Sequence, residues 1–203
     1  MVEVTEHQKN ASVNKVIWTS ADFYYLDHQL AKDMTSFFEK ANSPDVFKLD
    51  CDGIVLFEKE GKKYMFLTEL KSKFRTEDLY HAKTQIVSSF LKANMLLNIS
   101  TCYLLKDYII KGFIVGHPPM PDFLVNLHKG TMLSDKKKER EYELAKRIFI
   151  DSKSKKITLY PTDFLCLKNL PLGPLGIFPK IDLYYIEVPQ GQSSIALDVT
   201  NYL

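Results

Sequence analysis

The feature that most constrains the fold is a pair of apolar segments joined by a polar turn within residues 50–71. Residues 54–57 form a short apolar run, residues 58–63 contain one glycine among charged side chains, and residues 64–70 are mainly apolar again. Short apolar runs on either side of a glycine-containing turn are typical of a β-hairpin. We therefore predict two neighbouring strands at the centre of the fold.

Two charged residues interrupt the apolar pattern of the second predicted strand. Side chains alternate between faces along a strand, so Glu69 and Lys71 point to the same face as Met65 and Leu67. A carboxylate and an ammonium group on an otherwise apolar face cost free energy unless they have a partner or a function. Asp52, at the start of the first strand, would meet them across the hairpin. This arrangement predicts a functional site.

Helical periodicity appears on both sides of the hairpin. Apolar residues recur at helical spacing from Asp27, a candidate N-cap, and that helix would end at residues 42–44. The longest pattern opens at residue 75, with Thr76 as candidate N-cap and Gln85 beside its apolar stripe. That stripe consists of Leu79, Ala82, Ile86, Phe90, Ala93 and Leu97, widened by Val87 and Leu91. Further strands are predicted at 46–49, 101–105, 108–115, 157–160 and 181–188, and residues 13–18 fit either a strand or the approach to a helix.

This order of elements predicts a mixed α/β core in which a helix follows the hairpin and leads back to the sheet. A chain of 203 residues suits a single domain with a full core. The proline-rich residues 117–121 break the regular pattern and are the best candidate boundary. We expect residues 27–115 to form the core and residues 116–203, which include a charged helix over 135–149, to be a C-terminal elaboration of unassigned role.

Composition excludes several classes of protein. The net charge of +2 is too small to indicate a general nucleic-acid-binding surface, so any basic surface would be local. The three cysteines are far apart and lack metal-ligand spacing, which argues against a disulfide framework or a zinc site and for a reducing compartment. No apolar segment is long enough for a signal peptide or a membrane span. The expected location is the cytoplasm.

The centre of the chain resembles the PD-(D/E)xK phosphodiesterase superfamily, the restriction-endonuclease-like nucleases. Asp52 stands at a strand start, Glu69-Leu70-Lys71 forms the ExK tripeptide in the next strand, and a helix carrying Gln85 follows. The helix predicted before Asp52 carries Glu39 near its end, which also suits that family. The resemblance spans residues 27–115 and implies a restriction-endonuclease-like fold, with a mixed central sheet flanked by helices.

The resemblance implies a metal-dependent hydrolase, an endonuclease or exonuclease that uses Mg²⁺ or Mn²⁺. Hard oxygen ligands suit these ions, so Asp52 and Glu69, with the Leu70 backbone carbonyl and Glu39 as an outer carboxylate, form the implied metal site. Lys71 would orient the attacking water or neutralise the phosphate, and Gln85 would hold Lys71, a water or the substrate. DNA is implied ahead of RNA, in restriction, defence or repair.

Several assignments stay open at this stage. Asp50 shares a face with Asp52 and is an alternative acid, whereas Asp45, in the literal Pro-Asp pair, is too near the end of the preceding helix. Lys73 and Arg75 follow the ExK strand and would contact phosphates, or would simply be solvated. His81, one turn before Gln85, faces either the site or the solvent.

The alternative function is a non-catalytic nucleic-acid- or protein-binding module on the same fold, for which alanine at Asp52 or Glu69 would change little. A twofold-symmetric homodimer is a candidate assembly, because it would let two sites face the two strands of a duplex.

Overall fold

The computed structural model describes residues 1–6, 10–26, 33, 45–129, 135–168, 170, 172–173 and 175–203. Two β-sheets and three long helical segments make up most of this part of the chain, which confirms a mixed α/β fold. Among these residues, no helix is both long enough and apolar enough to cross a membrane. The helix expected from Asp27 to about residue 42 lies outside the described residues, apart from Asp33, which is helical.

A six-stranded sheet is the centre of the fold, with the strand order β3-β4-β5-β6-β8-β7. The pairs β3–β4, β4–β5 and β7–β8 are antiparallel, whereas β5–β6 and β6–β8 are parallel. The longest strand, β5, lies between β4 and β6, and therefore inside the sheet. The strands are β3 (Phe23–Leu26), β4 (Gly53–Lys59), β5 (Lys62–Lys71), β6 (Tyr108–Gly116), β7 (Lys156–Leu159) and β8 (Ile181–Glu187).

The predicted hairpin is confirmed as β4–β5. Its turn is Glu60-Gly61, with φ of 52° and 71°. Two successive positive φ values match the twist of the flanking strands, and glycine adopts them without steric cost. The register pairs Gly53 with Thr68, which places Asp52 opposite Glu69.

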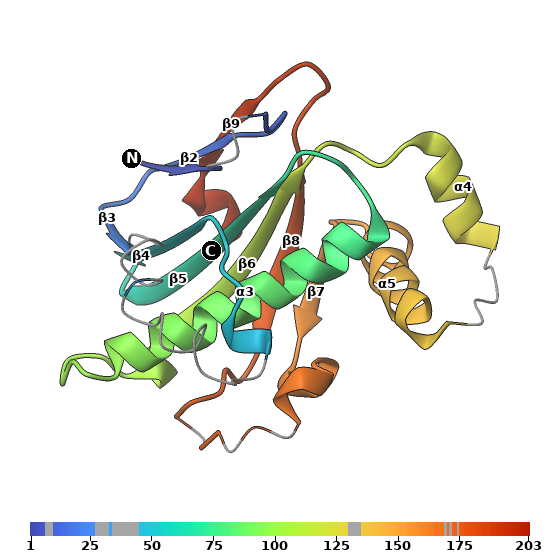
Figure 1. Cartoon of the computed structure of the whole chain (residues 1–203). Coiled ribbons are helices and arrows are strands. Elements are labelled where there is room, and N and C mark those ends of the chain that lie inside the picture. Colours follow the sequence, from blue (N-terminus) through green and yellow to red (C-terminus); the bar gives the residue numbers. More distant parts are fainter. Residues whose placement is uncertain are drawn as a thin grey trace.

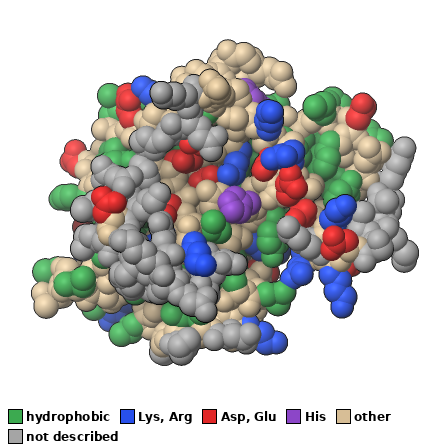
Figure 2. All heavy atoms as spheres, viewed as in Figure 1, with side chains coloured by type: hydrophobic (Ala, Val, Ile, Leu, Met, Phe, Trp, Pro, Cys, Tyr) green, Lys and Arg blue, Asp and Glu red, His purple; other side chains and the backbone are tan. Residues whose placement is uncertain are grey.

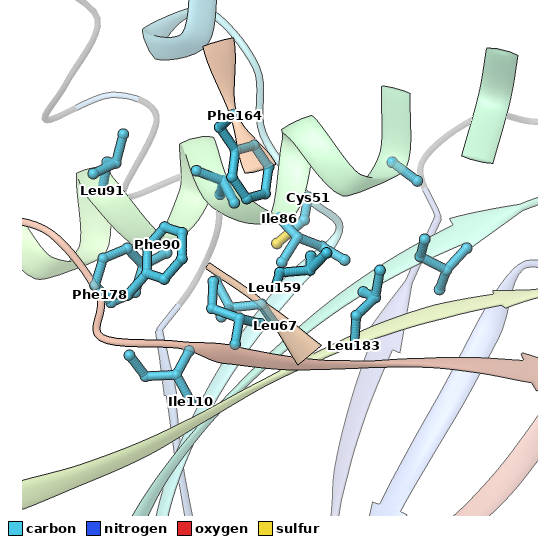
Figure 3. Close-up of a cluster of buried hydrophobic side chains, with 14 of the residues drawn as sticks. Cys51, Leu67, Ile86, Phe90, Leu91, Ile110, Leu159, Phe164, Phe178 and Leu183 are labelled. Atoms are coloured by element: carbon cyan, nitrogen blue, oxygen red, sulfur yellow. The ribbon is translucent and has the colours of Figure 1, made fainter. Parts of the chain in front are cut away.

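Helix α3 (Thr76–Leu97) crosses one face of the sheet (Figure 1). Its apolar stripe packs on strand residues such as Leu67, Ile110 and Leu183, and Figure 3 shows Ile86 and Phe90 of the helix at this interface. Helix α5 (Lys136–Lys146) continues into a π-helical turn (Arg147–Asp151) and packs beside α3, while α4 (Pro121–Lys129) lies at the outside.

The opposite face of the sheet is covered by a second, three-stranded sheet, where the sequence had predicted flanking helices. It consists of β1 (Val2–Thr5), β2 (Lys15–Thr19) and β9 (Ser194–Asp198) in the order β1-β2-β9, with β2 and β9 parallel. Residues 13–18 thus contribute a strand. Trp18 packs edge-on against Phe66 and Phe113 of the main sheet, with ring centroids 5.2 Å and 4.7 Å away.

Gly53 allows the close approach of β1 to the main sheet. A Cβ atom at this position would lie 2.6 Å from both methyl carbons of Val4, far inside van der Waals contact. The glycine that follows Asp52 is therefore required by packing between the two sheets.

Three local predictions are wrong. Residues 46–49 do not form a strand, because both edges of β4 are already paired, and Asp45–Phe47 is a 3₁₀ turn that buries Val46 and Phe47. Residues 101–105 form a turn and the start of a 3₁₀ segment (Leu105–Asp107), which buries Tyr103 and Leu105 without extending the sheet. The N-cap of α3 is Arg75, one residue before Thr76, and no side chain caps it.

The later predictions, 108–115, 157–160 and 181–188, correspond to β6, β7 and β8. Residues after the 117–121 break therefore supply two strands of the main sheet and one strand of the small sheet.

Candidate active site

Asp52, Glu69 and Lys71 meet at one end of the β4–β5 hairpin. The backbone N–H of Leu70 donates to Asp52 Oδ2 at 2.6 Å, which holds the Asp52 carboxylate against the neighbouring strand. Glu69 and Lys71 lie on the face that α3 covers, together with Met65 and Leu67, as strand alternation predicted.

Lys71, at the end of β5, links that strand to helix α3. Its Nζ lies 2.5 Å from Glu69 Oε1 and donates to Gln85 Oε1 on α3 at 2.9 Å. Gln85 in turn donates through Nε2 to the carbonyl of Asp50 at 2.8 Å. The contacts thus bring together all four residues that the resemblance implied for catalysis.

The Glu69 carboxylate is buried with half of its hydrogen-bonding capacity unused. The side chain is 2% exposed, and Oε2 has no hydrogen-bond partner among the described residues. Burial, followed by the nearby Asp52 carboxylate, raises the pKa of Glu69 well above its ordinary value, against the opposing effect of Lys71. Buried carboxylate oxygens are normally paired with a donor, an ordered water or an ion, so Oε2 is a candidate ligand atom.

Asp52 is also a buried carboxyl group whose ionised form is disfavoured. Burial raises the pKa of Asp52 to about 7, although the Leu70 N–H favours the ionised form. Glu6, at the end of β1, is close enough to raise the pKa of both carboxyl groups further. Two acids that both resist ionisation at neutral pH form a site that would be stabilised by added positive charge.

A row of polar side chains on α3 holds the segment that precedes Asp52. Ser88 Oγ donates to the carbonyl of Leu49 at 2.5 Å, and the N–H of Cys51 donates to Ser89 Oγ at 2.7 Å. Lys92, only 1% exposed, forms an ion pair with Asp50 at 2.5 Å.

The polar side chains of α3 distinguish the two candidate acids, Asp50 and Asp52. Asp50 is engaged by Lys92, whereas Asp52 faces Glu69. The sequence interpretation missed Lys92. The available signal was its position seven residues after Gln85, which places both on one side of the helix.

The other candidate residues lie at the rim. Lys73 and Arg75 line a cavity of about 650 Å³ together with Glu6, Lys71 and Asp78. Arg75 is exposed and pairs with Asp78 at 2.7 Å. His81 is exposed on α3, with its pKa lowered by partial burial and by Lys71. Figure 2 shows basic, acidic and histidine side chains gathered on this face of the molecule. Glu39 lies outside the described residues.

The set of candidate metal ligands in the described part of the chain is small. Within the described ranges, no group of three or more His, Cys, Asp or Glu side chains is arranged to hold a metal ion. Among the described residues that the resemblance implied as metal ligands, Asp52 and Glu69 supply two side-chain carboxylates. This number is compatible with Mg²⁺, which keeps several of its waters and is usually held by one or two carboxylates.

Comparison with known proteins found no matching family model, no similar curated protein and no similar solved structure. The functional argument therefore depends on the geometry of this site.

Proposed function

We propose that this protein is a metal-dependent nuclease with a restriction-endonuclease-like core, which hydrolyses phosphodiester bonds in nucleic acid, DNA ahead of RNA. The observation that carries the proposal is the buried, half-satisfied carboxylate of Glu69 beside Asp52, with the Lys71 ammonium group in contact with it. Burying two neighbouring carboxyl groups without a use for them is costly.

The topology around the site supports this assignment. An antiparallel hairpin is followed by a helix and then by a strand parallel to the second hairpin strand. The superfamily that the sequence resembles carries its acids on such a hairpin and a glutamine on the helix that follows. Lys71 contacts both Glu69 and Gln85, and Asp52 accepts from the neighbouring Leu70 N–H, which supports carrying these roles over to the four residues.

The two carboxylates fit a divalent cation. Asp52 and Glu69 would hold Mg²⁺ or Mn²⁺, and the ion would supply charge stabilisation and an activated water for hydrolysis. Oε2 of Glu69, which has no hydrogen-bond partner in the described part of the chain, is the ligand atom that such an ion would use.

Lys71 and Gln85 would complete the chemistry from the protein side. Gln85 orients the Lys71 ammonium group, because its amide is itself held by the Asp50 carbonyl. From that position Lys71 would orient the attacking water or neutralise the phosphate charge that grows during cleavage. Lys73 and Arg75, on the wall of the same cavity, would contact neighbouring phosphates.

A cleavage assay tests the proposal directly. Supercoiled plasmid, linear duplex, single-stranded DNA and RNA would be incubated with Mg²⁺, Mn²⁺ or EDTA. We expect metal-dependent cleavage by the wild type and its loss in Glu69→Ala and Lys71→Ala, because both variants remove groups at the reacting phosphate. Glu58→Ala and Lys62→Ala, exposed positions on the same hairpin, are the matched controls and should retain activity.

Each other outcome has a distinct meaning. Cleavage that survives in both site variants would locate the activity elsewhere and overturn the proposal. A wild type that binds nucleic acid but cuts none of the substrates would favour the non-catalytic binding module.

The pH dependence of stability provides an independent test. Burial raises the folded-state pKa of Asp52 from an ordinary 3.8 to about 7, so the folded protein holds this proton more tightly than the unfolded chain. The resulting stabilisation is fully present below the ordinary pKa and is lost as the pH rises through about 7. We expect the metal-free protein to lose on the order of a few kcal/mol across this window.

Thermal unfolding in EDTA over this pH range measures the effect. Asp52→Asn should flatten the profile, and Mg²⁺ should raise Tm most at the alkaline end, where the carboxylates are ionised. A profile that is identical in Asp52→Asn and wild type would contradict the burial argument.

A further inference from the structure

A second cavity adjoins the candidate active site. It measures about 600 Å³, and its walls include Phe74, Pro118, Met120 and Phe123. It shares three lining residues with the 650 Å³ cavity that Lys71 lines: Ser72, Lys73 and Arg75. The two cavities are therefore neighbours along one surface, with two basic side chains at their common boundary.

The chemistry of the second cavity differs from that of the first. It combines the apolar side chains of Phe74, Pro118, Met120 and Phe123 with polar ones, which include the amides of Asn126 and Gln190, the imidazole of His117 and the carboxylate of Asp122. Phe74 is held in place by Phe123, Phe149 and Tyr185, with ring centroids 4.9 Å, 5.2 Å and 6.0 Å away. The aromatic wall is thus supported by packing from α4, the π-helical turn and β8.

A nucleobase matches this combination of surfaces. Its flat face stacks on aromatic and aliphatic side chains, and its polar edge accepts and donates hydrogen bonds to amides. Lys73 and Arg75, at the boundary, complement the phosphate that joins such a base to the next nucleotide. A base inside a duplex is stacked and paired, so it cannot enter a side cavity unless it leaves the helix.

We propose that this cavity binds an unpaired nucleobase adjacent to the scissile phosphate, so that the substrate is a single strand or an unpaired end or flap rather than a continuous duplex. The inference rests on the proposed nuclease function, because that function places the phosphate beside Lys71. The sugar-phosphate chain would then pass Lys73 and Arg75 between the two cavities.

Binding without metal tests the inference separately from catalysis. Labelled oligonucleotides of ~12 nucleotides, a length that one binding groove can cover, would be titrated in EDTA by fluorescence anisotropy. Three probes carry similar backbones: a single strand with bases, the same strand with abasic sugars, and a blunt duplex. We expect the full-length protein to bind the base-bearing single strand roughly tenfold more tightly than the abasic strand, which loses a stacked base.

A matched pair of variants locates the effect. Asn126→Trp adds a bulky side chain at the edge of the cavity without changing charge, and should abolish the preference for the base-bearing strand. Val125→Trp, also exposed on α4 but not lining the cavity, should retain that preference. Comparing DNA with RNA versions of the strand would identify which backbone is preferred.

The outcomes separate the two proposals. Equal affinity for base-bearing and abasic strands, or unchanged base preference in Asn126→Trp, overturns the nucleobase cavity even if metal-dependent cleavage is observed. Base preference that disappears in Asn126→Trp supports the cavity even if no cleavage is found, and then the catalytic proposal alone fails. A wild type that binds no nucleic acid overturns this inference.

Discussion

Replacing Glu69 with glutamine is expected to reduce metal-dependent cleavage by at least 10²- to 10³-fold, roughly the cost of removing one electrostatic stabiliser of a transition state. The substitution preserves the shape of the side chain and an acceptor for Lys71, but it removes a negatively charged metal ligand. The same variant should not lose stability in EDTA. The wild-type carboxylate is buried and has a raised pKa, and one of its oxygens lacks a partner within the residues that the structure describes, so the folded protein gains little from it.

The measurement combines cleavage rates in Mg²⁺ with urea unfolding in EDTA at about pH 8, where the cost of burying carboxylates is largest. We expect the free energy of unfolding of Glu69→Gln to equal or exceed that of the wild type. Glu58→Gln, an exposed substitution on β4, controls for the chemistry of the change. A Glu69→Gln protein destabilised by several kcal/mol, with cleavage intact, would identify the Glu69–Lys71 pair as a structural ion pair instead.

Replacing Lys92 with methionine is expected to destabilise the protein by about 3–5 kcal/mol, the usual cost of removing one partner from a buried ion pair. Lys92 is 1% exposed and lies 2.5 Å from Asp50, whose side chain is 18% exposed. Without the ammonium group, the Asp50 carboxylate would remain largely buried without its cation. Because the same segment leads directly into Asp52, the variant should also weaken the metal-induced rise in Tm.

Urea unfolding of Lys92→Met beside the double variant Asp50→Asn/Lys92→Met distinguishes the ion pair from simple packing. The double variant removes both charges, so we expect it to recover a substantial part of the lost stability. Lys106→Met, at an exposed position, is the matched control and should change stability by less than about 0.5 kcal/mol. Stability of Lys92→Met equal to the wild type would show that the pair contributes nothing to holding the segment before Asp52.

Local patterns were sufficient for the central elements. The β4–β5 hairpin followed from two short apolar runs and a glycine turn, and α3 followed from an apolar stripe at helical spacing. Strand alternation alone placed Glu69 and Lys71 on one face. These features depend on residues within a few positions of one another, for which periodicity is informative.

Apolar content misled the prediction at residues 46–49 and 101–105. Both segments bury some of their apolar side chains (Val46, Phe47, Tyr103 and Leu105), but they do so from turns packed against the helix or its end. A turn buries Val46 or Tyr103 as well as a strand would. The hydrophobic pattern of the sequence therefore does not show whether the backbone of such a segment pairs with another strand. Such a segment forms a turn and not a strand where the neighbouring sheet edges are already paired with other strands.

The sequence by itself determined the hairpin, the helix after it, and the acids and lysine that they bring within reach of each other. Only the tertiary structure decided which aspartate faces Glu69, that Gln85 contacts Lys71, and that Lys92 neutralises Asp50. It also decided that β2 pairs with β9 across almost the whole chain, and that the aromatic cavity adjoins the site. The physical reason is that these contacts join residues distant in sequence, so their formation depends on packing of the whole core and local periodicity alone does not specify the partners.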